Sequence, residues 1–222
     1  QAVRVAIATD SPRIADVARA HGHEAIMTRA DHASGTERLA EAITLMELAE
    51  DTIVVNVQGD EPEIPPALID ALASCLASDP ECPMATAVHP VQSVADWLNP
   101  NVVKVVADAE DRALLFSRAP LPWSRSHLAW GLDAGTPQAR QAFEAAQPLR
   151  HIGMYAYRSR FLTRYAQLDP CALEDIEALE QLRVLHHGYR IKLLYTDDAP
   201  PAGVDTPADL ERVRARLGQG TH

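Results

Sequence analysis

Hydrophobic and polar residues alternate along the chain in two kinds of run. Short, β-branched runs are typical of strands, whereas runs with apolar residues three and four positions apart are typical of helices. The strand-like runs cover residues 3–8, 24–28, 52–57, 85–91, 102–107, 113–116, 151–157 and 189–195. The helix-like runs lie between or after them, at 12–21, 35–46, 66–76, 175–187 and 209–217. This alternation predicts an α/β fold built in layers.

Local signals support several of these elements. Ser34 and Glu37 have the spacing of a capping box, in which the serine oxygen accepts a hydrogen bond from the backbone of residue 37. Thr206 has the position of an N-cap for the last helix. The run 52–57 is continuous and β-branched, which is typical of a parallel strand buried on both faces. We therefore expect a mostly parallel central sheet flanked by helices, in a Rossmann-like arrangement.

Residues 126–150 interrupt this order. The segment contains two glycines and two prolines, and only 138–146 has enough helical character for a turn or two. We interpret it as a loop-rich flap or a dimer arm rather than a linker between domains. With 222 residues in all, a single domain is expected across 1–222.

Composition disfavours several classes of protein. Apolar runs stay far below the roughly 18 residues of a membrane span. The chain has 31 acidic and 20 basic residues, a net charge of −11, which disfavours nucleic acid or an anionic membrane as a partner. Cys75, Cys82 and Cys171 lack the spacing of a zinc site or a disulfide framework. We expect a reducing cytoplasm, and the N-terminal residues indicate strand and turn rather than a signal peptide.

The motif QGDEP directly follows the buried strand 52–57. Ligands of open α/β sheets bind beyond the carboxyl ends of strands, where a carboxylate offers oxygen to a hard cation such as Mg²⁺. Asp60 has this position, and Asp205 lies just before the last helix. Each has a simpler interpretation, because Asp60 is in a turn-forming sequence and Asp205 can help to cap a helix. Alternatively, the two carboxylates share one Mg²⁺.

A mixed set of polar residues lies later in the chain. His151 and Tyr155 share one face of their predicted strand. One face of the helix predicted over 175–187 carries Glu177, Glu180 and Gln181. Such donors and acceptors suit a polyhydroxylated sugar. The alternative is a charged helix face in contact with solvent.

Basic residues add a further candidate. Arg118 and Arg125 lie on either side of the proline-rich loop APLPW. A guanidinium group binds both oxygens of a carboxylate or phosphate, although each residue alone is also consistent with a surface arginine. Lys104 stands in an apolar strand, so its ammonium group either reaches solvent from an edge strand or points at an anion.

Seven segments in order resemble one family, the bacterial 3-deoxy-manno-octulosonate (Kdo) cytidylyltransferases, or CMP-Kdo synthetases. They are TRADHASGTERLAEA (28–42), QGDEP (58–62), NPNVVKVVADAE (99–110), LLFSRAPLPW (114–123), RHIGMYAY (150–157), IEALEQLRVL (176–185) and GVDTPADLERVRA (203–215). The resemblance implies a single α/β domain of the nucleotide-diphospho-sugar transferase type, a homodimer and a requirement for Mg²⁺. It implies an enzyme that joins CTP to Kdo, giving CMP-Kdo and pyrophosphate for lipopolysaccharide biosynthesis.

The resemblance also implies roles for individual residues. Asp60 and Asp205 would hold the Mg²⁺ between the anomeric oxygen of the sugar and the α-phosphate. The sugar acid would be bound by Gln58, His151, Tyr155, Glu180 and Gln181, with Arg118 or Arg125 on its carboxylate. The base and ribose of the nucleotide would face Arg29, Ser34, Gly35 and Arg38. For Ser34 a purely structural role in the capping box has equal weight.

One feature of the family does not occur in this sequence. Family members begin with a strand and a loop similar to I-P-A-R-x-x-S-x-R-L-P-G-K that binds the triphosphate, and no such motif precedes Gln1. If the protein lacks this segment, we expect little or no catalysis, and a non-catalytic binding or dimerisation module becomes the alternative. Another CMP-sugar-acid synthetase, such as one for sialic acid, and a metal-dependent glycosyltransferase are further alternatives.

Overall fold

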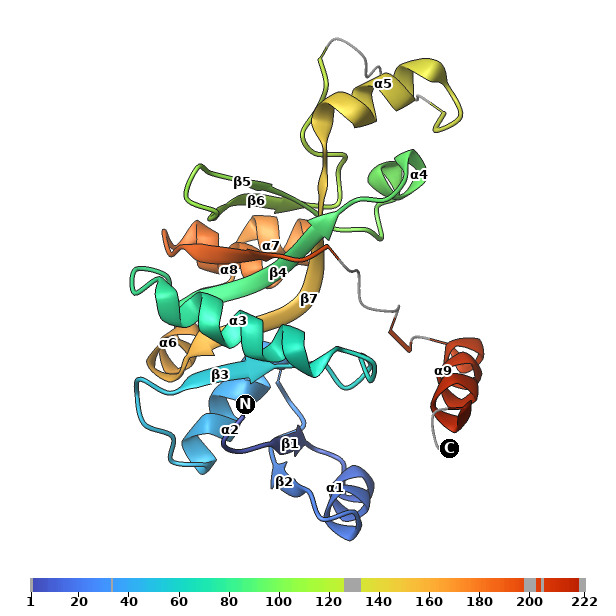
Figure 1. Ribbon diagram of the computed structural model, residues 1–222. Helices are drawn as coiled ribbons and strands as arrows, with labels where there is room; N and C mark the ends of the chain where they lie inside the picture. Colours follow the sequence, from blue (N-terminus) through green and yellow to red (C-terminus); the bar gives the residue numbers. More distant parts are fainter. Residues whose placement is uncertain (1, 33, 126–132, 198–202, 205, 220–222) are drawn as a thin grey trace.

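The computed structural model describes residues 2–32, 34–125, 133–197, 203–204 and 206–219, and Figure 1 shows the arrangement of its elements. The strands are β1 (Ala6–Thr9), β2 (Glu24–Met27), β3 (Ile53–Asn56), β4 (Met84–Pro90), β5 (Lys104–Ala107), β6 (Ala113–Ser117), β7 (Leu149–Arg158) and β8 (Ile191–Tyr195). The helices are α1 (Pro12–Ala20), α2 (Gly35–Leu45), α3 (Pro66–Ser78), α4 (Val94–Leu98), α5 (Pro137–Ala146), α6 (Ser159–Tyr165), α7 (Ala172–Glu177), α8 (Gln181–His186) and α9 (Pro207–Gln219).

The central sheet has six strands and is organised around β7. Its order is β6-β5-β7-β4-β8, and β3 also pairs with β7. Strand β7 runs antiparallel to β3, β4 and β5, whereas β4 and β8 are parallel. Four strands therefore point one way, and β6 and β7 point the other way. The expected α/β class is confirmed, with a mixed sheet in which most strands share one direction. β1 and β2 form a separate parallel pair.

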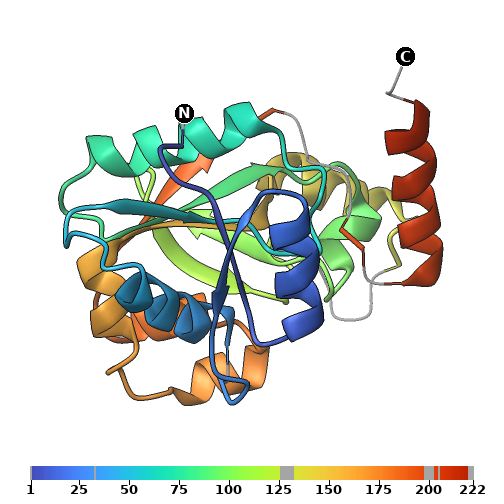
Figure 2. The same cartoon turned by 90° about the horizontal axis from the view of Figure 1, so that it is seen from below.

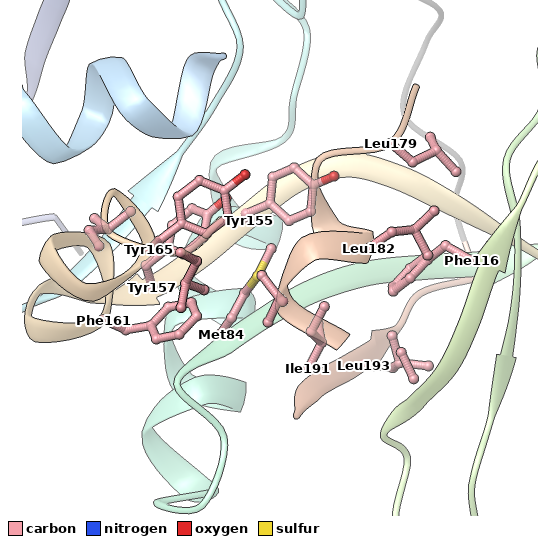
Figure 3. Packing of buried hydrophobic residues seen from close by; sticks show 14 of the residues in the cluster. Met84, Phe116, Tyr155, Tyr157, Phe161, Tyr165, Leu179, Leu182, Ile191 and Leu193 are labelled. Atoms are coloured by element: carbon pink, nitrogen blue, oxygen red, sulfur yellow. The ribbon is translucent and has the colours of Figure 1, made fainter. Parts of the chain in front are cut away.

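Helices cover both faces of this sheet, as Figure 2 shows. Helix α3 packs on one face, where Leu72 and Leu76 are fully buried against β4 and β7. Helices α2, α6 and α8 cover the other face. The core there combines aliphatic and aromatic side chains, with Tyr155 and Tyr157 of β7 beside residues of α6 (Figure 3). In the described part of the chain, no helix is long and apolar enough to cross a membrane.

Two predicted caps have the expected geometry. The Ser34 side chain accepts a hydrogen bond from the backbone N of Glu37 at 3.2 Å, and α2 begins directly after it. The Thr206 hydroxyl accepts one from the backbone N of Asp209, also at 3.2 Å. These caps are local in sequence, and each satisfies a helix N–H that has no partner within the helix.

The segment expected to be loop-rich contains a helix. Helix α5 occupies most of its described part, 133–150, and begins after the N-cap Thr136. It packs on α4, where Trp97 is fully buried next to Ala142. Residues 126–132 lie outside the described residues. The role of this segment as a flap or a dimer arm stays a prediction.

Candidate active site

A cavity of about 580 Å³ opens where β7 passes the beginning of α2 and the connection between α7 and α8. Seven of the thirteen site residues expected from the sequence line it: Ser34, Gly35, Gln58, His151, Tyr155, Glu180 and Gln181. Its other lining residues are Gly153, Glu174, Asp175, Ala178 and Leu179. We call this cavity the His151 pocket. It joins the expected sugar-binding residues with two of the expected nucleotide-binding residues.

His151 projects from β7 into the interior and is 9% exposed. Its Nε2 atom lies 2.9 Å from the hydroxyl of Thr86 on the neighbouring strand β4. Its ring packs against Phe116 on one side and Tyr155 on another, with centroids 5.1 and 5.3 Å away. Burial, helped by the charge of Arg150, lowers the pKa of His151 to about 3. The imidazole is therefore neutral at physiological pH.

Tyr155 and Gln181 form a buried polar pair. The Tyr155 hydroxyl donates to Gln181 Oε1 at 3.1 Å, and both residues are at most 3% exposed. Burial raises the pKa of Tyr155 well above its ordinary value, so the phenol keeps its proton and stays a donor. Tyr155 bonds the amide oxygen of Gln181 and not its amide nitrogen. Gln181 Nε2 is buried and has no hydrogen-bond partner among the described residues.

Glu180 places a carboxylate at the beginning of α2. Hydrogen bonds from Thr36 and Ser34 favour its ionised form, yet burial dominates and raises the pKa of the Glu180 carboxyl. A helix N-terminus also attracts negative charge, because its first N–H groups point outward. Ser34 therefore caps α2 and also donates to Glu180. The structural and site interpretations of Ser34 do not exclude each other.

The expectation of one helix over 175–187 was wrong. Helix α7 ends at Glu177, and Ala178 has a left-handed backbone with φ of 49° before α8 begins at Gln181. A buried ion pair connects the two pieces, because Arg183 donates to both carboxylate oxygens of Glu174 at 2.7 and 2.8 Å. The interruption separates Glu177 from the pocket and brings Glu180 and Gln181 into it.

Arg118 reinforces this interruption rather than lining the pocket. Its guanidinium group donates to the carbonyl oxygens of Glu177, Ala178 and Pro100 at 2.6, 3.4 and 3.1 Å. The Glu177 carboxylate in turn accepts from the hydroxyl of Ser117 and from the backbone N of Arg118, at 2.6 and 2.9 Å. These contacts attach the end of α7 to the end of β6.

Lys104 connects the end of β6 to the segment before β5. Its side chain is fully buried, and its ammonium group donates to the carbonyl oxygens of Asn99, Val102 and Arg118 at 2.9, 2.5 and 2.6 Å. Burial lowers the pKa of Lys104 to about 8. The expectation of a surface-reaching side chain is thus wrong. The direct acceptors are backbone carbonyls rather than an anion, although the charge of Glu177 attracts the ammonium group.

The remaining expected arginines lie outside the His151 pocket. Arg38 donates to Thr28 Oγ1 at 2.6 Å and lies 3.3 Å from Asp10, so it connects α2 to the ends of β1 and β2. The exposed Arg29 lies 3.7 Å from Asp31, and its backbone N donates to Glu41. Arg125 is exposed in the loop after β6. The structure therefore does not bring these side chains together with the sugar-side residues.

Asp60 is exposed in the loop after β3, whereas Asp205 lies outside the described residues. The segment just before Asp205 nevertheless contacts this loop. The backbone N of Val204 donates to the carbonyl oxygen of Asp60 at 2.7 Å. A Cβ atom on Gly203 would lie only 2.9 Å from the same oxygen, so this approach requires glycine. Among the described residues, no group of three or more His, Cys, Asp or Glu side chains forms a metal site.

Sequence reasoning missed three residues that line the pocket or hold its walls in place. Thr86, Glu174 and Arg183 contact the expected site residues or connect the elements that carry them. Thr86 lies in an ordinary buried strand, so nothing in its local pattern marks it. Glu174 and Arg183 are nine positions apart and lie in different helices, α7 and α8, so no single helical pattern pairs them.

The fold and the site define a nucleotidyltransferase of the α/β class, and the comparisons with known proteins agree. A family model described as cytidylyltransferase matches residues 1–191. The chain belongs to the cytidylyltransferase family.

Individual relatives extend this result. The chain is 55% identical to a 3-deoxy-manno-octulosonate cytidylyltransferase of Methylibium petroleiphilum, over 96% of this chain and 79% of the relative. It is similar to the solved structure of a CMP:2-keto-3-deoxy-manno-octonic acid synthetase complexed with CTP. That match has a TM-score of 0.84 and 40% identity, and it covers 98% of this chain and 81% of the other. A 4-diphosphocytidyl-2C-methyl-D-erythritol synthase shares the fold, with a TM-score of 0.52 and 13% identity over 96% of this chain and 79% of the other.

Proposed function

We propose that the protein transfers the cytidylyl group of CTP to Kdo, giving CMP-Kdo and pyrophosphate, a step in lipopolysaccharide biosynthesis. The observation that carries the proposal is the 55% identity, over 96% of the chain, to a relative named for this reaction. The His151 pocket agrees with it, because it combines a neutral imidazole, an amide donor and a carboxylate, and such mixed polar groups suit a polyhydroxylated ligand.

In the proposed reaction, the oxygen of the anomeric hydroxyl forms a bond to the α-phosphorus of CTP. The bond from that phosphorus to the pyrophosphate oxygen breaks, and the hydroxyl loses its proton. No covalent intermediate with the protein is required, so the contribution of the chain is to position the reactants and to stabilise charge. His151, Gln181 and Glu180 would orient the sugar together with Gln58, which follows β3 and also lines the pocket.

Mg²⁺ is part of the proposal, with Asp60 and Asp205 as its ligands. Carboxylate oxygens suit this ion, which typically takes one or two of them together with water and phosphate oxygens. The contact between Val204 and the Asp60 carbonyl supports the assignment, because the residue next to Asp205 already lies against the Asp60 loop. A bound Mg²⁺ would supply Lewis-acid stabilisation of charge on the phosphate oxygens.

For the carboxylate of the sugar acid, Arg125 is the better candidate of the two arginines. The guanidinium of Arg118 already donates to three backbone carbonyls, whereas Arg125 is exposed. On the nucleotide side, Ser34 and Gly35 line the pocket at the beginning of α2. We assign to Arg29 and Arg38 the role of holding the segment between β2 and α2 in place. From their positions, both side chains would also reach the base or the ribose of the nucleotide.

The proposal also includes a homodimer and a cytoplasmic location. The packed unit of α4 and α5 is a candidate for the dimer contact, because it projects from one end of the central sheet (Figure 1). The three cysteines are free thiols, which agrees with a reducing compartment. Light scattering of the purified chain tests the dimer, and a monomer at micromolar concentration would contradict it.

Product analysis tests the reaction itself. The purified chain is incubated with CTP, Mg²⁺ and either Kdo or sialic acid, and the products are separated and identified by mass spectrometry. We expect CMP-Kdo and pyrophosphate from Kdo, and only traces of product from sialic acid. Turnover of sialic acid but not Kdo would assign the chain to a different CMP-sugar synthetase. Nucleotide binding without any turnover would instead favour a non-catalytic module.

A further inference from the structure

We propose that Thr86 is a positioning residue that holds His151 as the Nε2–H tautomer, so that Nδ1 offers the pocket a hydrogen-bond acceptor selective for a ligand hydroxyl. The tautomer follows from the protein alone. The identity of the hydroxyl, as one of the sugar acid, rests on the proposed function.

The arrangement begins with an irregularity between two strands. The pairing of β4 with β7 shifts between Thr86 and Ala87, so that Thr86 lies opposite Tyr155 and Ala87 lies opposite Ile152. The two residues between them on β7, Gly153 and Met154, are left out of the regular pairing. Such a bulge releases backbone groups from the ladder and redirects side chains. Here it turns the carbonyl groups of β7 toward Thr86.

The Thr86 hydroxyl contacts two of these carbonyl groups. Its hydroxyl oxygen lies 2.7 Å from the carbonyl oxygen of Met154 and 3.2 Å from that of Ile152. A hydroxyl has a single proton, and a carbonyl oxygen only accepts. The Thr86 proton is therefore donated to a carbonyl. The contact of Thr86 with His151 Nε2 at 2.9 Å is then a hydrogen bond in which the nitrogen donates and the hydroxyl accepts.

The other ring nitrogen follows from this assignment. A neutral imidazole has one N–H, and the partner of that N–H decides which nitrogen carries it. Burial keeps His151 neutral, since its pKa is lowered to about 3. With the proton on Nε2, Nδ1 has a free lone pair. A flip of the ring would break the bond to Thr86 and disturb the contacts with Phe116 and Tyr155.

Nδ1 is open to the pocket. In the described part of the chain, the His151 side chain has no hydrogen bond besides the one to Thr86, and Gln181 Nε2 is the sole fully buried side-chain polar atom without a partner. Nδ1 is therefore accessible, and the accessible side of His151 lines the cavity. The pocket thus presents an acceptor on His151 and a donor on Gln181. A hydroxyl group both donates and accepts, so it complements this pair.

The test compares Thr86→Val, which keeps the shape but removes the hydroxyl, with Thr86→Ser, which keeps the hydroxyl. Thr44→Val is the matched control, because the Thr44 hydroxyl also donates to a backbone carbonyl but lies in α2 away from the pocket. The ligand-free proteins are labelled with ¹⁵N-histidine, and NMR reports which ring nitrogen of His151 is protonated. The His151 signals are assigned by their loss in His151→Gln.

We expect an Nε2–H signal and an unprotonated Nδ1 in the wild type, Thr86→Ser and Thr44→Val. In Thr86→Val we expect the Nδ1–H tautomer to become populated. With CTP and Kdo, Thr86→Val should raise the KM for Kdo about 10-fold, the effect of losing one hydrogen bond to the ligand, and should change kcat much less. Thr86→Ser should restore the KM to near the wild-type value.

Two results would overturn the proposal. An Nδ1–H signal from His151 in the wild type would contradict it even if Thr86→Val fails to fold. An unchanged tautomer in a folded Thr86→Val would show that Thr86 does not set it. The NMR experiment uses no substrate, so its result does not depend on the proposed function. Equally, the product analysis with CTP and Kdo does not depend on the tautomer of His151.

Discussion

Two cavities of similar size lie in the described part of the molecule, yet their polar groups are paired differently. One, of about 660 Å³, is lined by Arg112 and its neighbours near the start of β6. There Arg112 lies 3.2 Å from Asp79 and from Glu81 and 2.5 Å from Glu110, and Arg190 also pairs with Glu81. The charged groups of this cavity, which we call the Arg112 pocket, are paired with one another or, for Asp108, with the backbone N–H groups of Glu110 and Arg112.

The His151 pocket is smaller, at about 580 Å³, but its polar atoms are not all satisfied by the protein. Among the residues that the structure describes, Gln181 Nε2 has no partner, and under our assignment Nδ1 of His151 has none either. An unpaired buried donor is unfavourable in the free protein and gains a hydrogen bond only when a ligand supplies it. Volume alone would favour the Arg112 pocket. The hydrogen-bonding capacity left over identifies the His151 pocket as the ligand site.

The largest effect should come from the proposed metal ligand beside the His151 pocket. Replacing Asp60 by alanine should reduce turnover at least about 100-fold at saturating Mg²⁺, the scale for loss of one key charge-stabilising group. Glu110→Ala in the Arg112 pocket is the control and should retain wild-type turnover. Steady-state release of pyrophosphate measures both variants. Turnover near the wild-type rate in Asp60→Ala would refute the metal assignment.

A backbone contact gives the next effect. In Gly203→Ala the new Cβ would meet the Asp60 carbonyl oxygen at 2.9 Å, so the segment before Asp205 must move away. We expect turnover to fall about 10- to 100-fold, because small misplacements of reacting groups are costly. The half-saturating Mg²⁺ concentration should rise as well. Gly218→Ala in α9 meets no atom within 4 Å and should behave as the wild type. Equal rates in the two variants would contradict this reasoning.

A smaller effect should follow from removing the unpaired amide. Gln181→Met keeps the volume but removes the free donor, so the KM for Kdo should rise about 10-fold, the value of one hydrogen bond to a ligand. Arg190→Met, from the Arg112 pocket, should leave the KM unchanged. Steady-state kinetics with varied Kdo provides the comparison. A KM that responds to Arg190→Met instead would reverse the assignment of the two pockets.

The smallest effect concerns acid stability. Because the pKa of His151 is about 3 in the folded protein, the unfolded chain binds more protons between pH 6.5 and 3. The free energy of unfolding therefore falls as the pH falls through this window. From pH 7 to 5.5 the wild type should lose about 1 kcal/mol more than His151→Gln, as measured by urea unfolding at each pH.

An exposed histidine provides the control for that experiment. His23 is exposed on the connection between α1 and β2, so His23→Gln should follow the wild type at every pH. If wild type, His23→Gln and His151→Gln all lose the same stability between pH 7 and 5.5, His151 is not held neutral by burial.

Features that depend on nearby residues were predictable from the sequence. The capping box of Ser34 and Glu37 predicted the beginning of α2, and the β-branched run 52–57 predicted a strand where β3 lies. The expectation that this strand is parallel and buried on both faces was wrong, because β3 pairs antiparallel with β7 and its residues are only half-buried. The strand alternation of His151 and Tyr155 placed both side chains on one face, and the structure has both lining the pocket. Each of these predictions needs only the periodicity of one element.

Features that depend on distant residues were not predictable in this way. The break at Ala178 requires a left-handed alanine, which local propensity opposes, and it is held by contacts from Arg118 sixty positions earlier in the chain. The environment of Lys104 consists of backbone carbonyls from separate loops. The partner of His151, Thr86, lies on another strand and meets it only through the bulge in β7. Such arrangements follow from tertiary packing, which no single segment encodes.

A crystal structure with Kdo and CTP would test the central claim most directly. We predict that Kdo occupies the His151 pocket, with one hydroxyl within hydrogen-bond distance of both His151 Nδ1 and Gln181 Nε2. Kdo in the Arg112 pocket, or in the His151 pocket without a contact to either nitrogen, would contradict the account.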